Sequence, residues 1–256
     1  MKYYRVQTSE GPAWARQDQS ELRLIAGQPW KDPRDRSERR AFAEARLLAP
    51  ATPSKIVAIG LNYKDHAAER GKPLPKEPLL FLKPPSAVIG PGEAIRKPAW
   101  AGRVDHEAEL GIVIGKRTFD LASPETAGDH IFGVTCANDV TARELQAQDV
   151  QFTRAKGFDT FCPLGPCLTT DLDLSDLKVE GRVNGVVRQR SSTRELIFSP
   201  EYLVYFVARV MTLLPGDIIC TGTPAGIGPL AEGDEVEVEV EGVGILRNTV
   251  AMREER

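Results

Sequence analysis

Polar residues give way to a run of apolar, mostly β-branched residues along the stretch 104–115. The stretch reads Val-Asp-His-Glu-Ala-Glu-Leu-Gly-Ile-Val-Ile-Gly and predicts a strand that enters the core. Because side chains alternate along a strand, Glu107 and Glu109 point to one face, with their Cα atoms about 7 Å apart. Two neighbouring carboxylates beside a core repel each other, and a hard divalent cation such as Mg²⁺ would neutralise them. The alternative is a solvated strand end with two ordinary surface acids.

The first fifty residues follow a different pattern from the rest. Residues 3–7 and 21–26 predict short strands, with a turn at 10–12 between them. After the irregular residues 32–36, the charge pattern predicts a helical stretch that runs to residue 48. The sequence Ala-Pro-Ala-Thr-Pro at 49–53 is typical of a linker. We therefore predict a small N-terminal β-rich lobe, residues 1–50, which packs or dimerises, and a catalytic domain, residues 51–256.

Apolar runs and turn residues predict the elements of the larger domain. Strands are expected at 55–60, 79–83, 131–139 and 216–220, with a hairpin at 179–190 that turns at Asn184-Gly185. Helices are expected at 62–71, at 142–148 and from Ser199 onward, the last with an apolar stripe of Leu203, Phe206, Val207, Val210 and Leu214. Residues 235–240 alternate acid and valine, which predicts a half-exposed strand whose acids are solvated.

Composition narrows the class of protein. With 256 residues, 41% hydrophobic and 27% charged, the chain is typical of a globular protein. A net charge of -3 with few aromatic residues argues against a nucleic-acid or membrane partner. The N-terminus lacks the apolar segment of a signal peptide, and no uncharged run is long enough for a bilayer. Four cysteines without a C-x-x-C pair, and three histidines, indicate no zinc site. We expect a reduced cytoplasmic protein with four buried thiols.

Several polar residues occupy positions suited to catalysis. His66 and Glu69 share one face of a short helix, and a carboxylate beside an imidazole raises its basicity and fixes its tautomer, as a general base requires. The alternative is a surface ion pair. A proline-rich loop at 72–78 follows that helix, so the pair can belong to a lid. Asp139 lies at a strand-to-helix junction, where active-site residues often gather. On the helix that follows, Arg143 and Gln146 share a face.

Two lysines and a glycine-rich turn leave alternatives open. Lys83 ends an apolar strand and either snorkels to the surface or faces a site, and we predict snorkelling. Lys156 opens an apolar run and is either desolvated, with a lowered pKa, or paired with Asp159. Residues 221–228 lack the Gly-Lys-Ser/Thr of a phosphate loop, but their backbone N–H groups and the hydroxyl of Thr223 suit a carboxylate.

These segments together resemble one known family. From Lys55 to about Val250 the chain resembles the fumarylacetoacetate hydrolase superfamily, whose bacterial members include acylpyruvate hydrolases, oxaloacetate decarboxylases and 2-hydroxyhepta-2,4-diene-1,7-dioate isomerases. Some relatives carry Arg where this chain has Leu61, which favours the diene-dioate isomerase-like branch. The matching segments are Gly60-Leu61-Asn62-Tyr63 with His66 and Glu69, Phe81-Leu82-Lys83-Pro84, residues 105–110, Asn138-Asp139 through Arg143, Lys156-Gly157-Phe158-Asp159 and Gly222-Thr223-Pro224.

The resemblance implies a fold, a metal centre and a set of roles. The fold is α+β and β-rich, a mixed β-sandwich roll with short flanking helices, usually in a homodimer. One divalent metal, Mg²⁺ or else Mn²⁺ or Ca²⁺, would be bound by Glu107, Glu109 and Asp139. His66 with Glu69 would be the water-activating dyad on a lid helix. Lys156, Arg143 and Gln146 would line the substrate, and Thr223 would contact a substrate carboxylate.

The implied function is hydrolysis of a C–C bond in acylpyruvate-like or fumarylacetoacetate-like 2-keto (2-enol) acids. The alternatives on the same metal site are isomerisation of 2-hydroxyhepta-2,4-diene-1,7-dioate and decarboxylation of oxaloacetate. A protein of another class, a non-catalytic scaffold that kept the fold, would have lost a metal ligand or the dyad, and this chain has lost neither.

Overall fold

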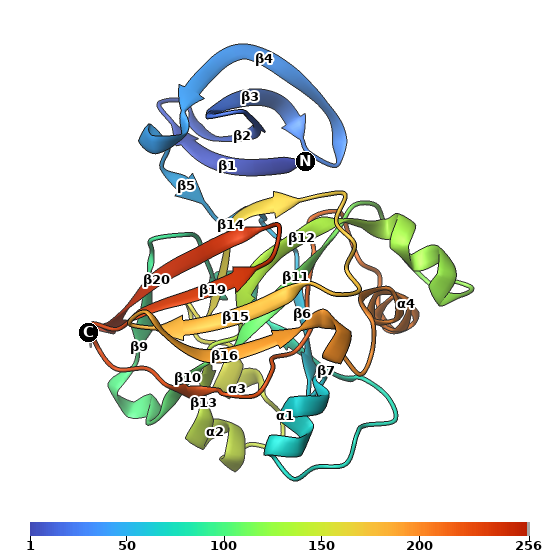
Figure 1. The fold of residues 1–256 in the computed structure, drawn as a ribbon, viewed down its shortest axis with the longest axis vertical. Helices are drawn as coiled ribbons and strands as arrows, with labels where there is room; N and C mark the ends of the chain where they lie inside the picture. The colour runs from blue at the N-terminus through green and yellow to red at the C-terminus, as the bar shows by residue number, and fades with distance from the viewer. Residues whose placement is uncertain (255–256) are drawn as a thin grey trace.

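The structure is a computed structural model that describes residues 1–254, and it is built from three β-sheets with a few short helices (Figure 1). This confirms the predicted β-rich α+β fold. The strands are β1 (Lys2–Thr8), β2 (Gly11–Asp18), β3 (Glu21–Gln28), β4 (Lys31–Ala41), β5 (Leu47–Leu48), β6 (Ile56–Gly60), β7 (Leu79–Lys83), β8 (Val88–Ile89), β9 (Ala94–Lys97), β10 (Val104–His106), β11 (Ala108–Ile114), β12 (Ile131–Asn138), β13 (Thr141–Ala142), β14 (Cys162–Thr169), β15 (Lys178–Val183), β16 (Val186–Ser192), β17 (Ile218–Cys220), β18 (Gly228–Pro229), β19 (Glu235–Val240) and β20 (Gly244–Met252). The α-helices are α1 (Lys64–Glu69), α2 (Arg143–Gln148), α3 (Thr153–Lys156) and α4 (Pro200–Val210).

The largest sheet runs through both parts of the chain. Its strand order is β4-β3-β2-β1-β14-β12-β11-β17-β6-β7, with β17 and β6 parallel and the other neighbours in this order antiparallel. Strand β1 pairs with β14, so the N-terminal strands extend the sheet of the rest of the chain. In Figure 1 these strands lie at one end of the molecule, and α1, α2 and α3 lie at the other.

The predicted charged helix before residue 48 is wrong, because residues 31–41 form the long strand β4. Its charged side chains pair across strands instead of along a helix. The carboxylate of Asp35 lies 2.6 Å from the Arg16 guanidinium, and the guanidinium of Arg39 lies 3.0 Å from Glu21. The second pair joins the neighbouring strands β4 and β3, and the first spans β3 to reach β2. Opposite charges that meet across strands stabilise a sheet. Strand β2, which also was not predicted, supplies one of these partners.

The main core lies between the large sheet and a five-stranded sheet with the order β16-β15-β19-β20-β9. Apolar side chains from β11, β12 and β14 meet those of β15, β19 and β20 there, including Leu110, Val134, Val179, Val238 and Leu246. Strand β19 lies in the middle of its sheet, so its acids are not all solvated as predicted: Glu237 is 6% exposed and lies 2.5 Å from the Arg247 guanidinium.

Helix α4 packs in a second core cluster with residues of β6, β11 and β17. Leu203 and Val207 of the predicted stripe are buried, which confirms them, but Phe206 and Val210 are not. The other buried residues of the helix are Pro200, Val204 and Ala208. Val210 is 59% exposed at the last position of the helix, and Leu214, which lies beyond the helix, is 41% exposed. Within residues 1–254, no helix has the length and apolar character needed to cross a membrane.

The predicted strand at 104–115 is interrupted at Glu107. Strand β10 precedes this residue and pairs with β13 and β18 in a small third sheet, whereas β11 follows it and belongs to the large sheet. Glu107 therefore lies where the chain passes from one sheet to another. This crossing, near the end of the molecule that carries α1, α2 and α3, positions the candidate site.

Candidate active site and metal centre

Three carboxylates that are distant in the sequence meet at this crossing. Side-chain oxygens of Glu107, Glu109 and Asp139 lie within 4.8 Å of one another, and the three residues are 5%, 1% and 1% exposed. The backbone N–H of Asp139 donates to the carbonyl of Glu107 over 2.9 Å, which holds the two segments together. Hard oxygen donors at this spacing fit a divalent cation. The buried group can therefore bind a divalent metal, and the alternative of a solvated strand end is wrong.

Lysines stabilise two of these acids. The ammonium of Lys156 lies 2.8 Å from Glu107 and 2.5 Å from Asp139, and the ammonium of Lys83 lies 2.6 Å from the other oxygen of Asp139. Lys83 is 1% exposed, so the prediction that it snorkels is wrong. Lys156 does not pair with Asp159, as one alternative predicted, because its ammonium contacts Asp139 and Glu107 instead. Its pKa is also not lowered. Burial lowers the pKa of Lys156, but the charges of Asp139 and Glu107 outweigh burial and raise it.

Glu109 is the acid with the least compensation. Its carboxylate accepts a hydrogen bond of 2.8 Å from the backbone N–H of Gly222, and no lysine or arginine within residues 1–254 forms an ion pair with it. Burial and the charges of Asp139 and Glu107 raise its pKa well above the usual value. A bound cation would supply the missing compensation, which is a second indication that a metal fits here.

A glycine is required at the residue that donates to Glu109. Gly222 has a φ of +95°, and a Cβ atom at this position would lie 2.8 Å from the Cβ of Asn62. The side-chain amide of Asn62 in turn donates to the carbonyl of Thr221 over 2.8 Å. The Asn of the Asn-Tyr motif thus holds the glycine-rich loop against the acidic centre.

The predicted dyad is present on α1. Nδ1 of His66 lies 2.8 Å from an Oε atom of Glu69, and the other Oε atom accepts a 3.0 Å hydrogen bond from the backbone of Gly226. At the start of the helix, Asp65 accepts a 2.8 Å hydrogen bond from the hydroxyl of Ser191. This contact occupies Nδ1, so Nε2 is the ring nitrogen left for another partner, and the His66 side chain lines the cavity.

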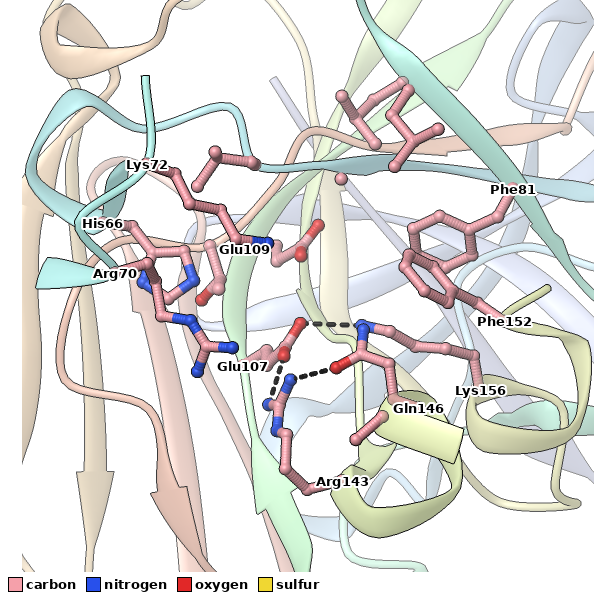
Figure 2. A pocket seen from close by; sticks show the side chains of 16 residues that line it. His66, Arg70, Lys72, Phe81, Glu107, Glu109, Arg143, Gln146, Phe152 and Lys156 are labelled. Atoms are coloured by element: carbon pink, nitrogen blue, oxygen red, sulfur yellow. Dashed lines mark hydrogen bonds and ion pairs between the residues drawn. The ribbon is translucent and has the colours of Figure 1, made fainter. Parts of the chain in front are cut away.

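A cavity of about 370 Å³ joins these groups (Figure 2). Figure 2 shows His66, Arg70 and Lys72 on one wall, Phe81, Phe152 and Lys156 on the opposite wall, and Glu107 and Glu109 between them. The two phenylalanine rings pack edge to face with centroids 5.5 Å apart. The cavity therefore combines an acidic centre, an apolar side and a cationic side.

The remaining predicted residues lie around the same cavity. The guanidinium of Arg143 contacts Glu107 at 2.5 Å, Asp105 at 3.0 Å and the side-chain oxygen of Gln146 at 2.6 Å. The hydroxyl of Thr223 donates to the carbonyl of Ala108 over 2.9 Å. The structure thus brings all nine predicted site residues together, while their roles stay predictions.

Two supporting residues were missed in the sequence. The side-chain amide of Gln189 donates to Thr223 over 2.8 Å, and its oxygen accepts from the backbone of Ala108 over 2.9 Å and from Nδ1 of His106 at 3.0 Å. It lies on β16, where no sequence pattern separates it from its charged neighbours. Lys83 was missed although a lysine at the end of an apolar strand is a visible signal.

Similarity to known proteins covers the whole chain. The family model described as Fumarylacetoacetate (FAA) hydrolase C-terminal matches residues 55–251, and the model described as Rv2993c-like, N-terminal, matches residues 1–50. Oxaloacetate tautomerase FAHD2A, mitochondrial, of Bos taurus is 44% identical over 221 residues, which are 81% of this chain and 70% of that protein.

Two solved structures show the same fold. The 5-carboxymethyl-2-hydroxymuconate delta-isomerase from Mycobacterium smegmatis superposes with a TM-score of 0.93 at 44% identity, over 99% of this chain and 100% of that one. The maleylpyruvate hydrolase from Sphingobium sp. SYK-6, in complex with manganese(II) and pyruvate, gives a TM-score of 0.83 at 30% identity, over 99% and 100% of the two chains.

Proposed function

Since this chain belongs to the fumarylacetoacetate hydrolase family, as its motifs predicted, we propose that it is a divalent-metal-dependent hydrolase. Its substrates would be acylpyruvate-like or fumarylacetoacetate-like 2-oxo (2-enol) acids, in which it breaks a C–C bond. The observation that carries this proposal is that His66, which pairs with Glu69, lines one cavity together with Glu107 and Glu109 of the acidic centre. A cytoplasmic homodimer belongs to the same proposal and rests on the resemblance alone.

Glu107, Glu109 and Asp139 would hold the metal, with Mg²⁺ as the first candidate and Mn²⁺ or Ca²⁺ as alternatives. When bound, such an ion would polarise the keto group and carboxylate of a 2-oxo acid. The hydrolase from Sphingobium, which is 30% identical, was solved with manganese(II) and pyruvate. That pair of ligands supports both the metal and the class of substrate.

The chain's own residues would move the protons and stabilise the charge. Nε2 of His66 would take a proton from the attacking water, and the carboxylate of Glu69 would stabilise the imidazolium that forms. The ammonium of Lys156 would stabilise negative charge that develops on the substrate. Arg143 and Gln146 would bind the substrate at the base of the cavity, and Thr223 would contact its carboxylate.

Isomerisation or tautomerisation is the second candidate. The chain is 44% identical to an isomerase and to an oxaloacetate tautomerase, against 30% to the hydrolase. Leu61 at the cavity wall favours the same branch. In this reaction His66 would carry a proton between oxygen and carbon of the 2-enol acid, with no water consumed. Decarboxylation of oxaloacetate is the third reaction that the same residues would serve.

A substrate panel with Mg²⁺ or Mn²⁺ separates these reactions. Cleavage products from acetylpyruvate would support hydrolysis, a shift in diene absorbance would support isomerisation, and CO₂ from oxaloacetate would support decarboxylation. Glu109→Gln should lose both metal binding, measured by calorimetry, and every activity. If it retains both, the metal centre has been assigned wrongly.

A second variant tests the dyad separately from the metal. His66→Ala should abolish hydrolysis while its affinity for the metal stays close to that of the unchanged protein. Since His66 is not among the three carboxylate ligands, equal loss of metal binding and activity would show that its proposed role is wrong.

A further inference from the structure

The cavity carries two cations that the proposed chemistry does not use. Arg70 directly follows α1, Lys72 lies two residues later, and both line the cavity. Figure 2 shows the two side chains next to His66, on the wall opposite Phe81 and Phe152.

These cations differ from the others in the cavity by having no anionic partner. Arg143 contacts Glu107 at 2.5 Å, and Lys156 contacts the same residue at 2.8 Å. Within residues 1–254, neither Arg70 nor Lys72 forms an ion pair or a side-chain hydrogen bond. Two unpaired positive charges on one wall of a concave site form a ready contact for an anionic group of a ligand.

Hydrogen bonds hold the backbone at both cationic residues. The N–H of Arg70 donates to the carbonyl of His66 over 3.0 Å, and the N–H of Lys72 donates to that of Ala67 over 2.9 Å. Between them, Gly71 has a φ of +60°, the left-handed conformation that ends a helix and reverses the chain. The helix itself is tied at both ends, since Asp65 bonds to Ser191 and Glu69 to Gly226. The backbone that carries both exposed side chains is therefore fixed, which removes part of the entropy cost of binding.

We propose that Arg70 and Lys72 bind the remote carboxylate of a dicarboxylic substrate. This rests on the proposed function, in which the 2-oxo acid end lies at the acidic centre. The carbon chain would then run from the acidic centre toward the wall that faces Phe81 and Phe152, and the second carboxylate would meet the two cations there. The enzyme therefore selects 2-oxo (2-enol) dioates over mono-acids of the same chain length.

Three ligands with the same 2-oxo acid end distinguish binding at this subsite from binding at the metal centre. With Mg²⁺ present, calorimetry would measure binding of pyruvate, 2-oxopentanoate and 2-oxoglutarate. Pyruvate has only the 2-oxo acid end, 2-oxopentanoate adds a carbon chain, and 2-oxoglutarate adds the remote carboxylate. The double variant Arg70→Gln with Lys72→Met should weaken 2-oxoglutarate binding about 10- to 100-fold and leave the other two within about threefold, because charge-assisted hydrogen bonds are lost for one ligand alone.

Lys76→Met is the matched control. This exposed lysine lies in the same loop and does not line the cavity, so its loss should leave all three affinities unchanged. Equal weakening of all three ligands in the double variant, or no preference of the unchanged protein for 2-oxoglutarate, would overturn the subsite. Failure of pyruvate to bind would instead contradict the proposed function. In that case the ratio of the affinities for 2-oxoglutarate and 2-oxopentanoate would still test whether Arg70 and Lys72 bind the remote carboxylate.

Discussion

Replacing Lys83 with methionine should destabilise the metal-free protein and, at the same time, tighten metal binding. The ammonium of Lys83 lies 2.6 Å from Asp139 and 3.3 Å from the carbonyl of Val140, in a side chain that is 1% exposed. Methionine has a similar length but no charge. The variant would therefore leave the carboxylate of Asp139 buried with one cation fewer.

The size of both effects follows from these contacts. Removing one partner of a buried ion pair destabilises a protein by about 3–5 kcal/mol. We expect about 3 kcal/mol, the lower end of that range, because Lys156 remains 2.5 Å from Asp139. In a chain of this size the loss lowers the melting temperature by roughly 6–12 °C. A metal ion at Asp139 would replace the lost positive charge, so we expect the affinity for Mn²⁺ to rise about tenfold, or about 1.4 kcal/mol.

Urea unfolding is measured for both proteins, with EDTA and with saturating Mn²⁺, and calorimetry measures their affinity for Mn²⁺. Together these values complete the thermodynamic cycle that links folding to metal binding. The difference in unfolding free energy between the two proteins should shrink with Mn²⁺ by the amount that calorimetry gives. Lys55→Met is the control, because Lys55 pairs at 2.5 Å with Asp217, a buried carboxylate outside the metal group. Its cost should be the same with and without Mn²⁺. An unchanged difference for Lys83→Met would refute metal binding at Asp139.

Two further predictions concern stability away from the site. Leu203→Ala should lower the free energy of unfolding by about 2–5 kcal/mol, because the side chain is fully buried. Val210→Ala, on the exposed end of α4, should change it by less than about 0.5 kcal/mol. Equal effects of the two variants in urea unfolding would contradict the buried face assigned to α4. Burial alone would raise the pKa of Glu180, but hydrogen bonds from Lys178 and Arg190 lower it from 4.5 to about 2. The stabilisation of the folded protein by ionised Glu180 is therefore complete above about pH 4.5 and is lost as the pH falls toward 2. Glu180→Gln should flatten the plot of unfolding free energy against pH in this range. Parallel plots for the variant and the unchanged protein would contradict the lowered pKa of Glu180.

The fold was predictable where the apolar pattern has a clear period. Strands such as β6 and β12, and the helix that begins at Pro200, lie close to their predicted positions. Strand β4 was not predictable in this way, since all but one of its eleven residues are exposed and it has no apolar alternation. Its conformation is set by pairing with β3 and by arginine–carboxylate contacts across the sheet. The sequence of residues 31–41 alone shows neither which strand β4 pairs with nor the register of that pairing.

The site was predictable at the level of acids and dyad, because Glu107 with Glu109 and His66 with Glu69 are close in sequence. The arrangement of the lysines was not. Lys83 lies 56 residues before Asp139, and its environment depends on the end of β12. Local sequence shows an apolar strand that ends in lysine, for which snorkelling is the ordinary outcome. The partners of Lys156 were missed for the same reason.

The two lysines explain how the acidic centre can be buried at all. Three carboxylates within 4.8 Å of one another would be prohibitive in a core without compensation. Lys83 on β7 and Lys156 on α3 supply it, each at a different oxygen of the Asp139 carboxylate. On the proposed function, a bound metal would take over part of this role. The ammonium of Lys156, which also lines the cavity, would then be available to an anionic substrate. The same side chain would thus stabilise the fold before the metal binds and the substrate after it.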